Sequence, residues 1–351
     1  MQTNFKSIDK NKSILLTGVG TTNQHLKDIV KPDSYEETLE VFGQSNLSDA
    51  YRLLEAMGAE HIYVMNLEKI YDIVSASEMI AEQHFAYVVP LFYASEYFYD
   101  VLSKGKKTYY VQYLLRKLYK NPANETVILA TDTKANLYED LDSFLSDMDL
   151  AIRRITANAT SNENYCNLVF VANMLNNIQY ANVYLAGMIV NSNIDEYPYF
   201  NYGESSVMDI YDDISPDFWL DKEDISNELV YFKKHMDSSI TVENLLNLYR
   251  PENKSIIKIF FILRLLKYIS NEMDFSELIG KTYREYYRTR AEEIVVAFLN
   301  SIKGHYIIDY KLDKVYPKEN QKHKGTVDLF VKYRVLPVNC TEWYTVEKKV
   351  V

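Results

Sequence analysis

A glycine-rich turn after the first apolar segment is the first place where this sequence could do chemistry. Ser13-Ile-Leu-Leu-Thr-Gly18 is typical of a buried strand and runs into Gly18-Val-Gly-Thr-Thr-Asn23. A strand followed by Gly-x-Gly begins the fingerprint that binds the pyrophosphate of a dinucleotide. The fingerprint is incomplete, because Asn23 replaces the third glycine and Tyr63-Val-Met-Asn-Leu67 has no acidic residue for a ribose. The sequence therefore favours a tight strand-to-loop turn over a nucleotide site.

Carboxylates, imidazoles and thiols are the other groups that could bind a metal or act as nucleophiles. Asp195–Asp224 is acidic, yet it lacks the Asp-x-Asp-x-Asp-Gly loop of calcium sites, so we expect a solvated surface insertion at about 195–224. The six histidines have no metal-ligand spacing, and Cys166 and Cys340 lie far apart in sequence. The sequence has neither a Gly-x-Ser-x-Gly elbow nor a phosphate loop ending in Gly-Lys-Ser/Thr. We expect no metal, no cofactor and no enzymatic activity.

The length of 351 residues allows two domains with full cores or one large domain. Met1-Gln-Thr-Asn-Phe-Lys6 has neither the charged nor the apolar region of a signal peptide. The most apolar stretch, Ile256–Ile269, is too short for a membrane span and is interrupted by Lys258, Arg264 and Lys267. We therefore expect a protein made in the cytoplasm, with no membrane insertion.

Charge is spread unevenly along the chain. Residues 251–351 contain 18 Lys and Arg against 13 Asp and Glu, which leaves 20 against 36 in the first 250 residues. The overall net charge of −11 argues against a nucleic-acid partner. The contrast between an acidic part and a basic part indicates two faces with different partners, or an acidic surface that keeps the protein soluble.

Apolar runs and helical patterns alternate between residues 13 and 250. Strands are expected near 13–18, 62–65, 86–92, 126–130 and 167–172, with helices between them. The first helix should be capped by Ser34, with Glu37 completing a capping box and Gly43 ending it. Such alternation predicts an α/β domain, a mostly parallel sheet wrapped by helices, over residues 13–250.

A smaller α+β domain is expected over residues 251–340. An amphipathic helix with Tyr287, Ala291, Ile294, Phe298 and Ile302 on one face should end at Gly304. A β-rich segment over 305–312, a loop dotted with lysines, and a cleanly alternating strand within 325–338 follow. Residues 341–351 form a C-terminal strand arm, which is either the last strand of the chain's own sheet or a strand given to a neighbouring copy.

Motifs along the chain occur in the order found in contractile phage tail sheath proteins. Ile14-Leu-Leu-Thr-Gly18, the helix Ser34–Gly43 ending in Phe-Gly, and Gly58-Ala-Glu-His-Ile-Tyr-Val come first. Val183-Tyr-Leu-Ala-Gly-Met188 follows, and Gly325–Val338 precedes a terminal strand at Trp343–Val346. The chain resembles this family, from phage tails or phage-tail-like injection particles, more closely at its two ends than in its middle.

The resemblance implies a structural subunit that polymerises helically around a tail tube and contracts to drive the tube through a target envelope. Its partners would be further copies of itself, the tube protein, and baseplate and terminator proteins, in a particle assembled in the host cytoplasm. In the family, arms at both ends of the chain add strands to sheets of neighbouring subunits. The implied linking residues are Phe5 and Ile8 in a short N-terminal arm of residues 1–12, and Trp343, Tyr344, Thr345 and Val346 in the C-terminal arm.

The same resemblance places the C-terminal domain against the tube and the other domain outward. A net-basic inner domain would hold an acidic tube by many weak contacts, although each lysine could equally be an ordinary solvated charge. The tube-facing candidates are Lys311, Lys314, Lys318, Lys322, Lys324, Arg284 and Arg288.

Two alternatives stay open at the level of the sequence. One is a cytoplasmic α/β enzyme or nucleotide-binding protein, for which no motif gives positive support. The other is a tail cap or initiator subunit built on the sheath fold. Only about a dozen residues precede Ile14, whereas sheath proteins usually have a longer arm there, so we expect either an abbreviated N-terminal linkage or one made by Thr3–Ile8 alone.

Overall fold

The structure, a computed structural model, divides into two compact units, Met1–Phe260 and Phe261–Val351. Each unit is described by itself. The described residues are 8–100, 105–119, 126–134, 137–138, 141–156, 167–175, 179–194, 199–200, 229–234, 240–243, 260–279, 284–320, 327–338 and 340–350.

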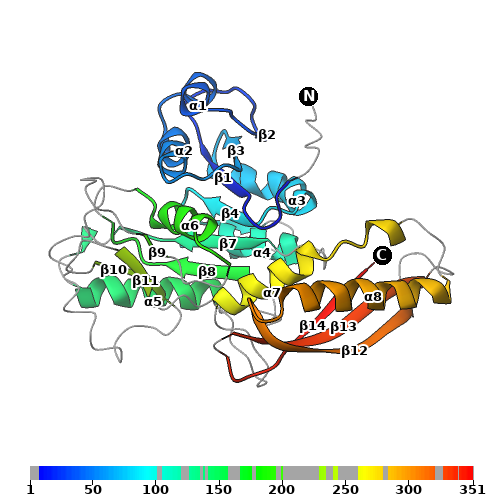
Figure 1. Ribbon diagram of the computed structural model, residues 1–351. Helices are drawn as coiled ribbons and strands as arrows, with labels where there is room; N and C mark the ends of the chain where they lie inside the picture. Colours follow the sequence, from blue (N-terminus) through cyan, green and yellow to red (C-terminus); the bar gives the residue numbers. More distant parts are fainter. Residues whose placement is uncertain are drawn as a thin grey trace. The chain divides into compact units, whose positions relative to one another are not determined.

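Unit 1 is built on one large sheet with nine described strands (Figure 1). The six central strands β3, β1, β4, β7, β8 and β10 run parallel, and antiparallel strands flank them at both edges. The expectation of a mostly parallel sheet is confirmed. In sheet order the strands are β2 (Ile29–Val30), β3 (Ile62–Leu67), β1 (Ile14–Val19), β4 (Tyr87–Pro90), β7 (Val127–Thr131), β8 (Leu168–Val171), β10 (Leu229–Lys234), β11 (Ile240–Glu243) and β9 (Tyr199–Phe200).

Local signals fix the helices of unit 1. The hydroxyl of Ser34 accepts from the Glu37 N–H at 3.3 Å, and Gly43 ends the helix at a φ of +69°, as predicted. The Glu37 carboxylate accepts from the N–H of Asp33 (2.7 Å) rather than from that of Ser34, so the box closes one residue early. The helices are α1 (Tyr35–Phe42), α2 (Asn46–Ala56), the 3₁₀ turn η1 (Ile70–Asp72), α3 (Ile73–Gln83), α4 (Tyr110–Tyr119), α5 (Leu141–Thr156) and α6 (Ala181–Asn191).

Helix α6 is buried on all sides and packs against α2, β4, β7 and β8. Gly187 makes this close packing possible, because a Cβ added there would lie 2.5 Å from the sulfur of Met57. The Asn182 amide on the same helix donates to the carbonyls of Pro90 (2.9 Å) and Leu129 (2.8 Å), which ties α6 to the end of β4 and the middle of β7. This helix therefore sets the position of the loops at the carboxyl edge of the sheet.

Unit 1 also contains an antiparallel hairpin that the sequence pattern missed. It consists of β5 (Tyr97–Asp100) and β6 (Lys106–Tyr109) and lies between β4 and α4. Tyr97 and Tyr99 stay exposed on it, and the Lys107 amine lies 3.6 Å from the centre of the Tyr97 ring. The segment is too short to show a strand period that can be separated from a loop rich in aromatic residues.

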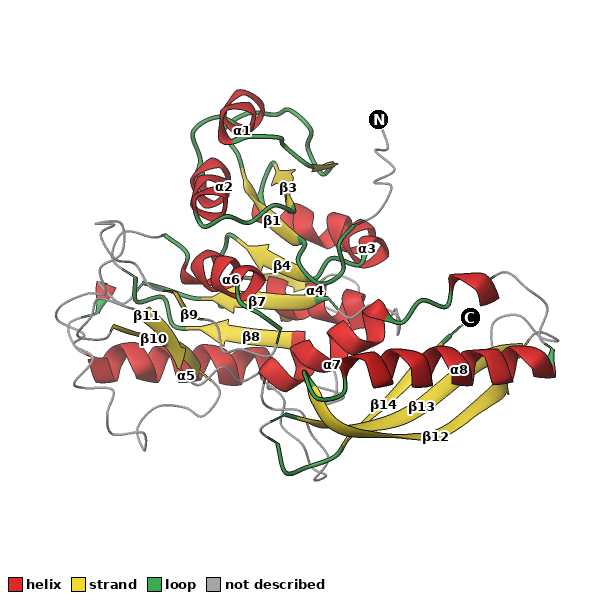
Figure 2. Ribbon diagram, viewed as in Figure 1, coloured by secondary structure: helices red, strands yellow, loops and turns green. Residues whose placement is uncertain are grey.

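Unit 2 contains a long helix lying along a three-stranded antiparallel sheet (Figure 2). Ala291, Val295, Leu299 and Ile302 are the buried residues of this helix, which packs on β12 and β13. The elements are α7 (Phe260–Glu272), the turn η5 (Ser276–Leu278), α8 (Glu285–Ile302), β12 (Ile307–Glu319), β13 (Val327–Pro337) and β14 (Tyr344–Lys349), and the strand order is β12-β13-β14.

Two details of unit 2 correct the sequence prediction. The buried stripe of α8 is centred on Val295 and Leu299, whereas Ile294 and Phe298 are only half-buried. The run Ile294–Leu299 is apolar throughout, so helical spacing alone did not determine which face packs. Strand β12 also continues to Glu319 through the stretch expected to be a loop, because Val315 packs inward between exposed lysines.

Candidate assembly interface

The glycine-rich turn after β1 is closed by the protein's own groups. The side-chain oxygen of Asn66 accepts from the Gly20 N–H at 2.8 Å, and its amide donates to the carbonyls of Thr22 and Gln24 at 3.0 Å each. The Thr21 N–H donates to the carbonyl of Phe42 (2.9 Å). A dinucleotide site needs such N–H groups free to face the pyrophosphate. The turn therefore has the structural role that the sequence favoured.

Strand β14 pairs antiparallel with β13 of its own chain. The register joins six residue pairs, from Val335–Tyr344 to Phe330–Lys349, and the Val350 N–H continues it by donating to the Leu329 carbonyl (2.8 Å). The strand includes Tyr344, Thr345 and Val346, whereas Trp343 lies just before it with 44% of its side chain exposed. Within the described part of unit 2, the other long edge of β14 has no strand beside it.

Side chains on both faces of β14 attach it to its surroundings. On the face toward the helices, the Lys348 amine donates to the carbonyl of Ser270, near the end of α7, and lies 5.8 Å from the Phe275 ring centre. On the opposite face, Lys349 forms an ion pair with Asp328 at 3.0 Å, and the Tyr316 hydroxyl donates to Glu347. This donation is the largest cause of the raised pKa of Tyr316.

The sheet face opposite α8 gathers the predicted lysines of β12, and we call it the lysine face. Lys311 and Lys314 pair across the sheet with Arg334 and Lys332 of β13, while Lys318 pairs with Asp328. Residues paired across antiparallel strands share a face, so these charges lie on the same side. The lysine face comprises Lys311, Lys314, Lys318, Lys332, Arg334 and Lys349, with the acids Asp313, Asp328 and Glu347 between them.

Aromatic rings organise part of the lysine face. Tyr316 and Phe330 stack at 5.8 Å with 22° between their planes. The Lys314 amine lies 4.2 Å from the centre of the Tyr316 ring, and that of Lys318 lies 5.6 Å from the Phe330 ring. Arg334 binds Asp313 at 2.8 Å, which lowers the pKa of that carboxyl. The surface is thus basic, but it is interrupted by local ion pairs.

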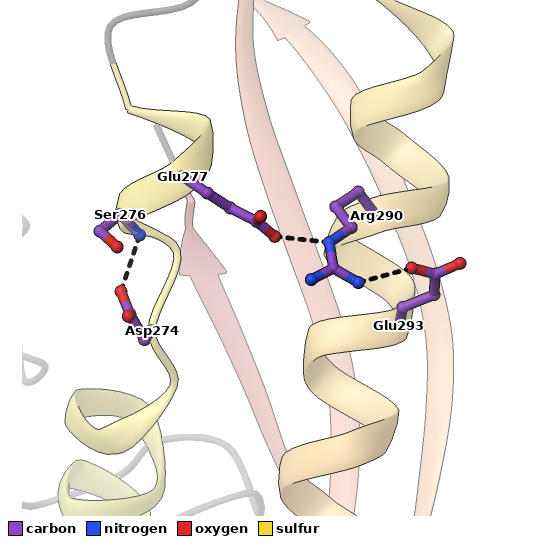
Figure 3. A network of polar contacts seen from close by, with 5 residues as sticks. All are labelled: Asp274, Ser276, Glu277, Arg290 and Glu293. Atoms are coloured by element: carbon purple, nitrogen blue, oxygen red, sulfur yellow. Dashed lines mark hydrogen bonds and ion pairs between the residues drawn. The ribbon is translucent and has the colours of Figure 1, made fainter.

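Arg284 and Arg288 do not join the lysine face, because they belong to the start of α8. Arg288 is already engaged by Glu285 (3.2 Å) and Glu292 (3.5 Å) on its own helix. Two residues further along, Arg290 bridges Glu277 of η5 at 2.5 Å and Glu293 at 2.8 Å. Figure 3 shows this bridge beside the Asp274 carboxylate, which accepts from the Ser276 N–H at 2.8 Å and begins the short turn. The structure therefore gives this end of α8 a network of intramolecular ion pairs.

Several predicted residues fall outside the described part of the chain. Phe5, Lys322 and Lys324 belong to this group, as does nearly all of the acidic stretch 195–224 and Cys166. Ile8 is described and half-buried, at the start of the described chain. The N-terminal linkage and the tube-facing role of Lys322 and Lys324 stay predictions.

One pair of carboxylates at the carboxyl edge of the unit 1 sheet was missed by sequence reasoning. Glu96 follows β4 and Asp132 follows β7; the Glu96 Oε2 atom is buried without a hydrogen-bond partner. Burial, and then the charge of Asp132, raise the pKa of Glu96 to about 7. Asp132 instead accepts from the Ser95 N–H (2.7 Å) and hydroxyl (2.9 Å). Only the rule that parallel strands end at one edge could have indicated the pair, since 35 residues separate its members.

The described part of the chain holds no cluster of three or more metal-binding side chains. None of its helices is both long and apolar enough to cross a bilayer.

Comparison with known proteins gives no match to a family model and no significant match to a curated protein. Solved structures do match. A chain from the baseplate of the anti-feeding prophage (AFP) has a TM-score of 0.63 at 11% identity, covering 95% of this chain and 91% of that one. The sheath tail protein Lin1278 of Listeria innocua also has 0.63, at 10% identity, covering 97% and 95%.

A third match comes from the contracted sheath of an extracellular contractile injection system, the PVC sheath complex. It has a TM-score of 0.62 at 12% identity and covers 95% of this chain and 90% of that one. Both units are therefore included in each alignment, and the order of motifs noted in the sequence agrees with this likeness. Over nearly its whole length, the chain has the fold of contractile tail sheath proteins.

Proposed function

We propose that this chain is the subunit of a contractile tail sheath, which polymerises helically around a tail tube and contracts to drive that tube through a target envelope. The observation that carries the proposal is the match of both units to solved sheath proteins over 95% or more of the chain. At 10–12% identity this likeness fixes the fold, so the function rests also on the surfaces of unit 2.

Strand β14 supports the linkage that such an assembly needs. It lies at the edge of a small sheet, where main-chain hydrogen bonds to β13 hold it in place. Bonds of this kind tolerate changes in side chains and keep neighbouring subunits connected while the subunits rotate. In this proposal Tyr344, Thr345 and Val346, with Trp343 before them, form the strand given to a neighbouring subunit, and the N-terminal arm with Phe5 and Ile8 adds a second link.

The lysine face supports contact with an acidic tube. In this proposal residues 251–340 form the inner domain and residues 13–250 the outer one. Exposed charge pairs contribute about 0–1 kcal/mol each, so six cations spread over one face would hold a tube by contacts that are additive and easily broken. Contraction would then need no cofactor, because free energy stored in an extended lattice is released as new interfaces form. Baseplate and terminator proteins complete the proposed partners, in a tail particle assembled in the host cytoplasm.

Negative-stain electron microscopy of the purified chain, beside a version that ends at Cys340, tests the proposal. The full chain should form long tubes or stacked rings, and the truncated chain should form none. Far-UV circular dichroism of both proteins serves as the control, because unit 1 contributes most of the secondary structure and should be unchanged. Uniform small particles from the full chain under all conditions would contradict a sheath.

A second candidate function is a cap or initiator subunit that carries the same fold. It is favoured by one observation, the match to a chain in the AFP baseplate, which covers 95% of this chain. An initiator would form rings of fixed size that do not elongate at any concentration. Electron microscopy over a hundredfold range of concentration separates the two roles by particle length.

A further inference from the structure

We propose that β14 caps its own subunit: paired with β13 of the same chain, it occupies the position that the β14 of a neighbour would take, and so slows the start of polymerisation from free subunits. This inference rests on the proposed sheath function. It concerns the free chain and the control of assembly, whereas the sheath proposal concerns the assembled state.

The first support is that most of this edge of β13 is already used in the single chain. Six residue pairs and the Val350–Leu329 hydrogen bond occupy it from Leu329 to Val335. A second strand cannot hydrogen-bond to this edge until β14 leaves, because each backbone group on it accepts one partner strand.

The second support is that β14 is attached at its far end by more than the ladder. Lys348 donates to the Ser270 carbonyl, Lys349 pairs with Asp328 at 3.0 Å, and Val350 is 93% buried at the next position. Opening the strand breaks these contacts together, so detachment is a cooperative step with a barrier rather than gradual fraying.

The third support is that all these contacts can be remade between subunits. Leu329, Asp328 and Ser270 belong to the body that receives the strand, so a neighbour's β14 would find the same partners. Exchange is then nearly neutral in contact energy, and local concentration decides the outcome. A tethered strand competes at an effective concentration in the millimolar range, which a free neighbour does not reach but a subunit fixed at a growing end does.

The connection between the strands allows the exchange to reach a neighbour. Six residues, 338–343, join Pro337 to Tyr344. Fully extended they span roughly 20 Å, so the acceptor edge must lie within about that distance of Pro337. The consequence is assembly that starts slowly from free subunits and proceeds quickly from an existing end.

A removable disulfide between β13 and β14 tests this directly. Because Leu329 and Val350 form a hydrogen-bonded pair, the alternation of the ladder makes Lys332 and Glu347 a non-hydrogen-bonded pair, whose closer spacing suits a disulfide. The test protein carries Lys332→Cys and Glu347→Cys, with Cys166 and Cys340 replaced by Ser. The control shares Lys332→Cys and adds Lys314→Cys, which joins β12 to β13 and leaves β14 free.

Oxidised monomers of the test protein should fail to elongate short sheath tubes assembled from the parent, which is the chain without these substitutions. Reduction with dithiothreitol should restore elongation. The control should elongate in both redox states. Oxidation of preformed test tubes should give covalent multimers on a non-reducing gel, because the strands are by then exchanged. Two results would overturn the inference and leave the sheath proposal intact. One is that the oxidised test protein elongates tubes as fast as the reduced test protein does. The other is that oxidised test tubes give only monomers on the non-reducing gel. Failure of the reduced protein and of the parent to form tubes would instead contradict the sheath proposal.

Discussion

Asn66 illustrates how a buried amide determines what the glycine-rich turn can do. Its side chain makes three hydrogen bonds to residues 20–24, and it is fully buried. Those bonds hold the backbone of the turn against β3. A dinucleotide-binding protein would have an acidic side chain at the end of this strand, so Asn66 is one of the two departures from that fingerprint, beside Asn23.

Replacement of Asn66 by Ala should lower the free energy of unfolding by about 2–4 kcal/mol, because a partly buried N–H and two carbonyls lose their buried partner. Urea denaturation followed by circular dichroism measures the change. Asn46→Ala is the control, since Asn46 is exposed and makes one long contact to Tyr180 at 3.4 Å; its effect should stay within about 0.5 kcal/mol. Equal effects from the two changes would show that Asn66 does not hold the turn.

Glu96 should make the stability of the protein depend on pH. Burial and Asp132 raise its pKa from 4.5 to about 7, so the folded state keeps a proton that the unfolded chain releases. The proton kept by Glu96 contributes its full stabilisation of the folded state below about pH 4.5, and this stabilisation is lost as the pH rises through 7. Glu96→Gln should therefore stabilise the protein at pH 8, on the order of 1–2 kcal/mol after allowance for solvent screening, and change little at pH 4.5.

The measurement for Glu96 is a series of urea denaturation curves between pH 4.5 and 8. Glu68→Gln, which alters an exposed carboxylate after β3, is the matched control and should follow the parent at every pH. Parallel pH profiles for the parent and Glu96→Gln would refute the role given to this carboxyl group.

At the scale of elements, β14 has two long edges with different roles. Val346 is in a hydrogen-bonded pair with Tyr333, so its N–H faces β13, whereas the N–H of Glu347 faces the edge without a described neighbour. The two edges can be blocked separately by proline, which removes a single N–H.

Val346→Pro should abolish tube formation, because the donated strand loses a ladder bond and meets a steric clash at β13. Glu347→Pro should leave pairing with β13 in place and affect only a strand that adds to the far edge, such as the N-terminal arm. Sedimentation of tubes from the two variants and the parent measures the difference. Normal tubes from Val346→Pro would rule out β14 as the link between subunits.

At the scale of the whole molecule, the charge contrast between the two parts of the chain predicts binding that salt can release. The triple change Lys311→Glu, Lys314→Glu and Lys318→Glu inverts the lysine face and should weaken binding to the tube at least tenfold, about 1.4 kcal/mol. Parent binding should fall as the salt concentration rises, since exposed charges are screened.

Co-sedimentation of sheath protein with purified tube measures this binding. The exposed pair Lys106→Glu and Lys107→Glu on the β5–β6 hairpin is the control for charge alone and should leave binding unchanged. Binding that is lost in both variants to the same extent would mean that the lysine face is no specific tube surface.

Much of the fold could be predicted from the sequence, because strands such as β1, β3 and β8 are short apolar runs and helices such as α1 carry their own caps. The buried face of α8 could not be predicted, because the six consecutive apolar residues Ile294–Leu299 fit several faces of the helix equally. The strand character of residues 313–319 was hidden by lysines, whose exposure on one side of a two-faced sheet looks like a loop. No local sequence pattern predicts which strand β14 pairs with, because pairing with β13 of the same chain and pairing with β13 of a neighbour would use the same residues.

The most direct test of the central claim is a cryo-electron microscopy reconstruction of assembled tubes in which the connection from Pro337 to Tyr344 can be traced. The sheath account predicts a helical lattice with unit 2 lining the inside and the β14 of each subunit paired with the β13 of a neighbour. Tubes in which every β14 remains on its own β13 would contradict strand exchange, and the absence of any helical lattice would contradict the sheath function.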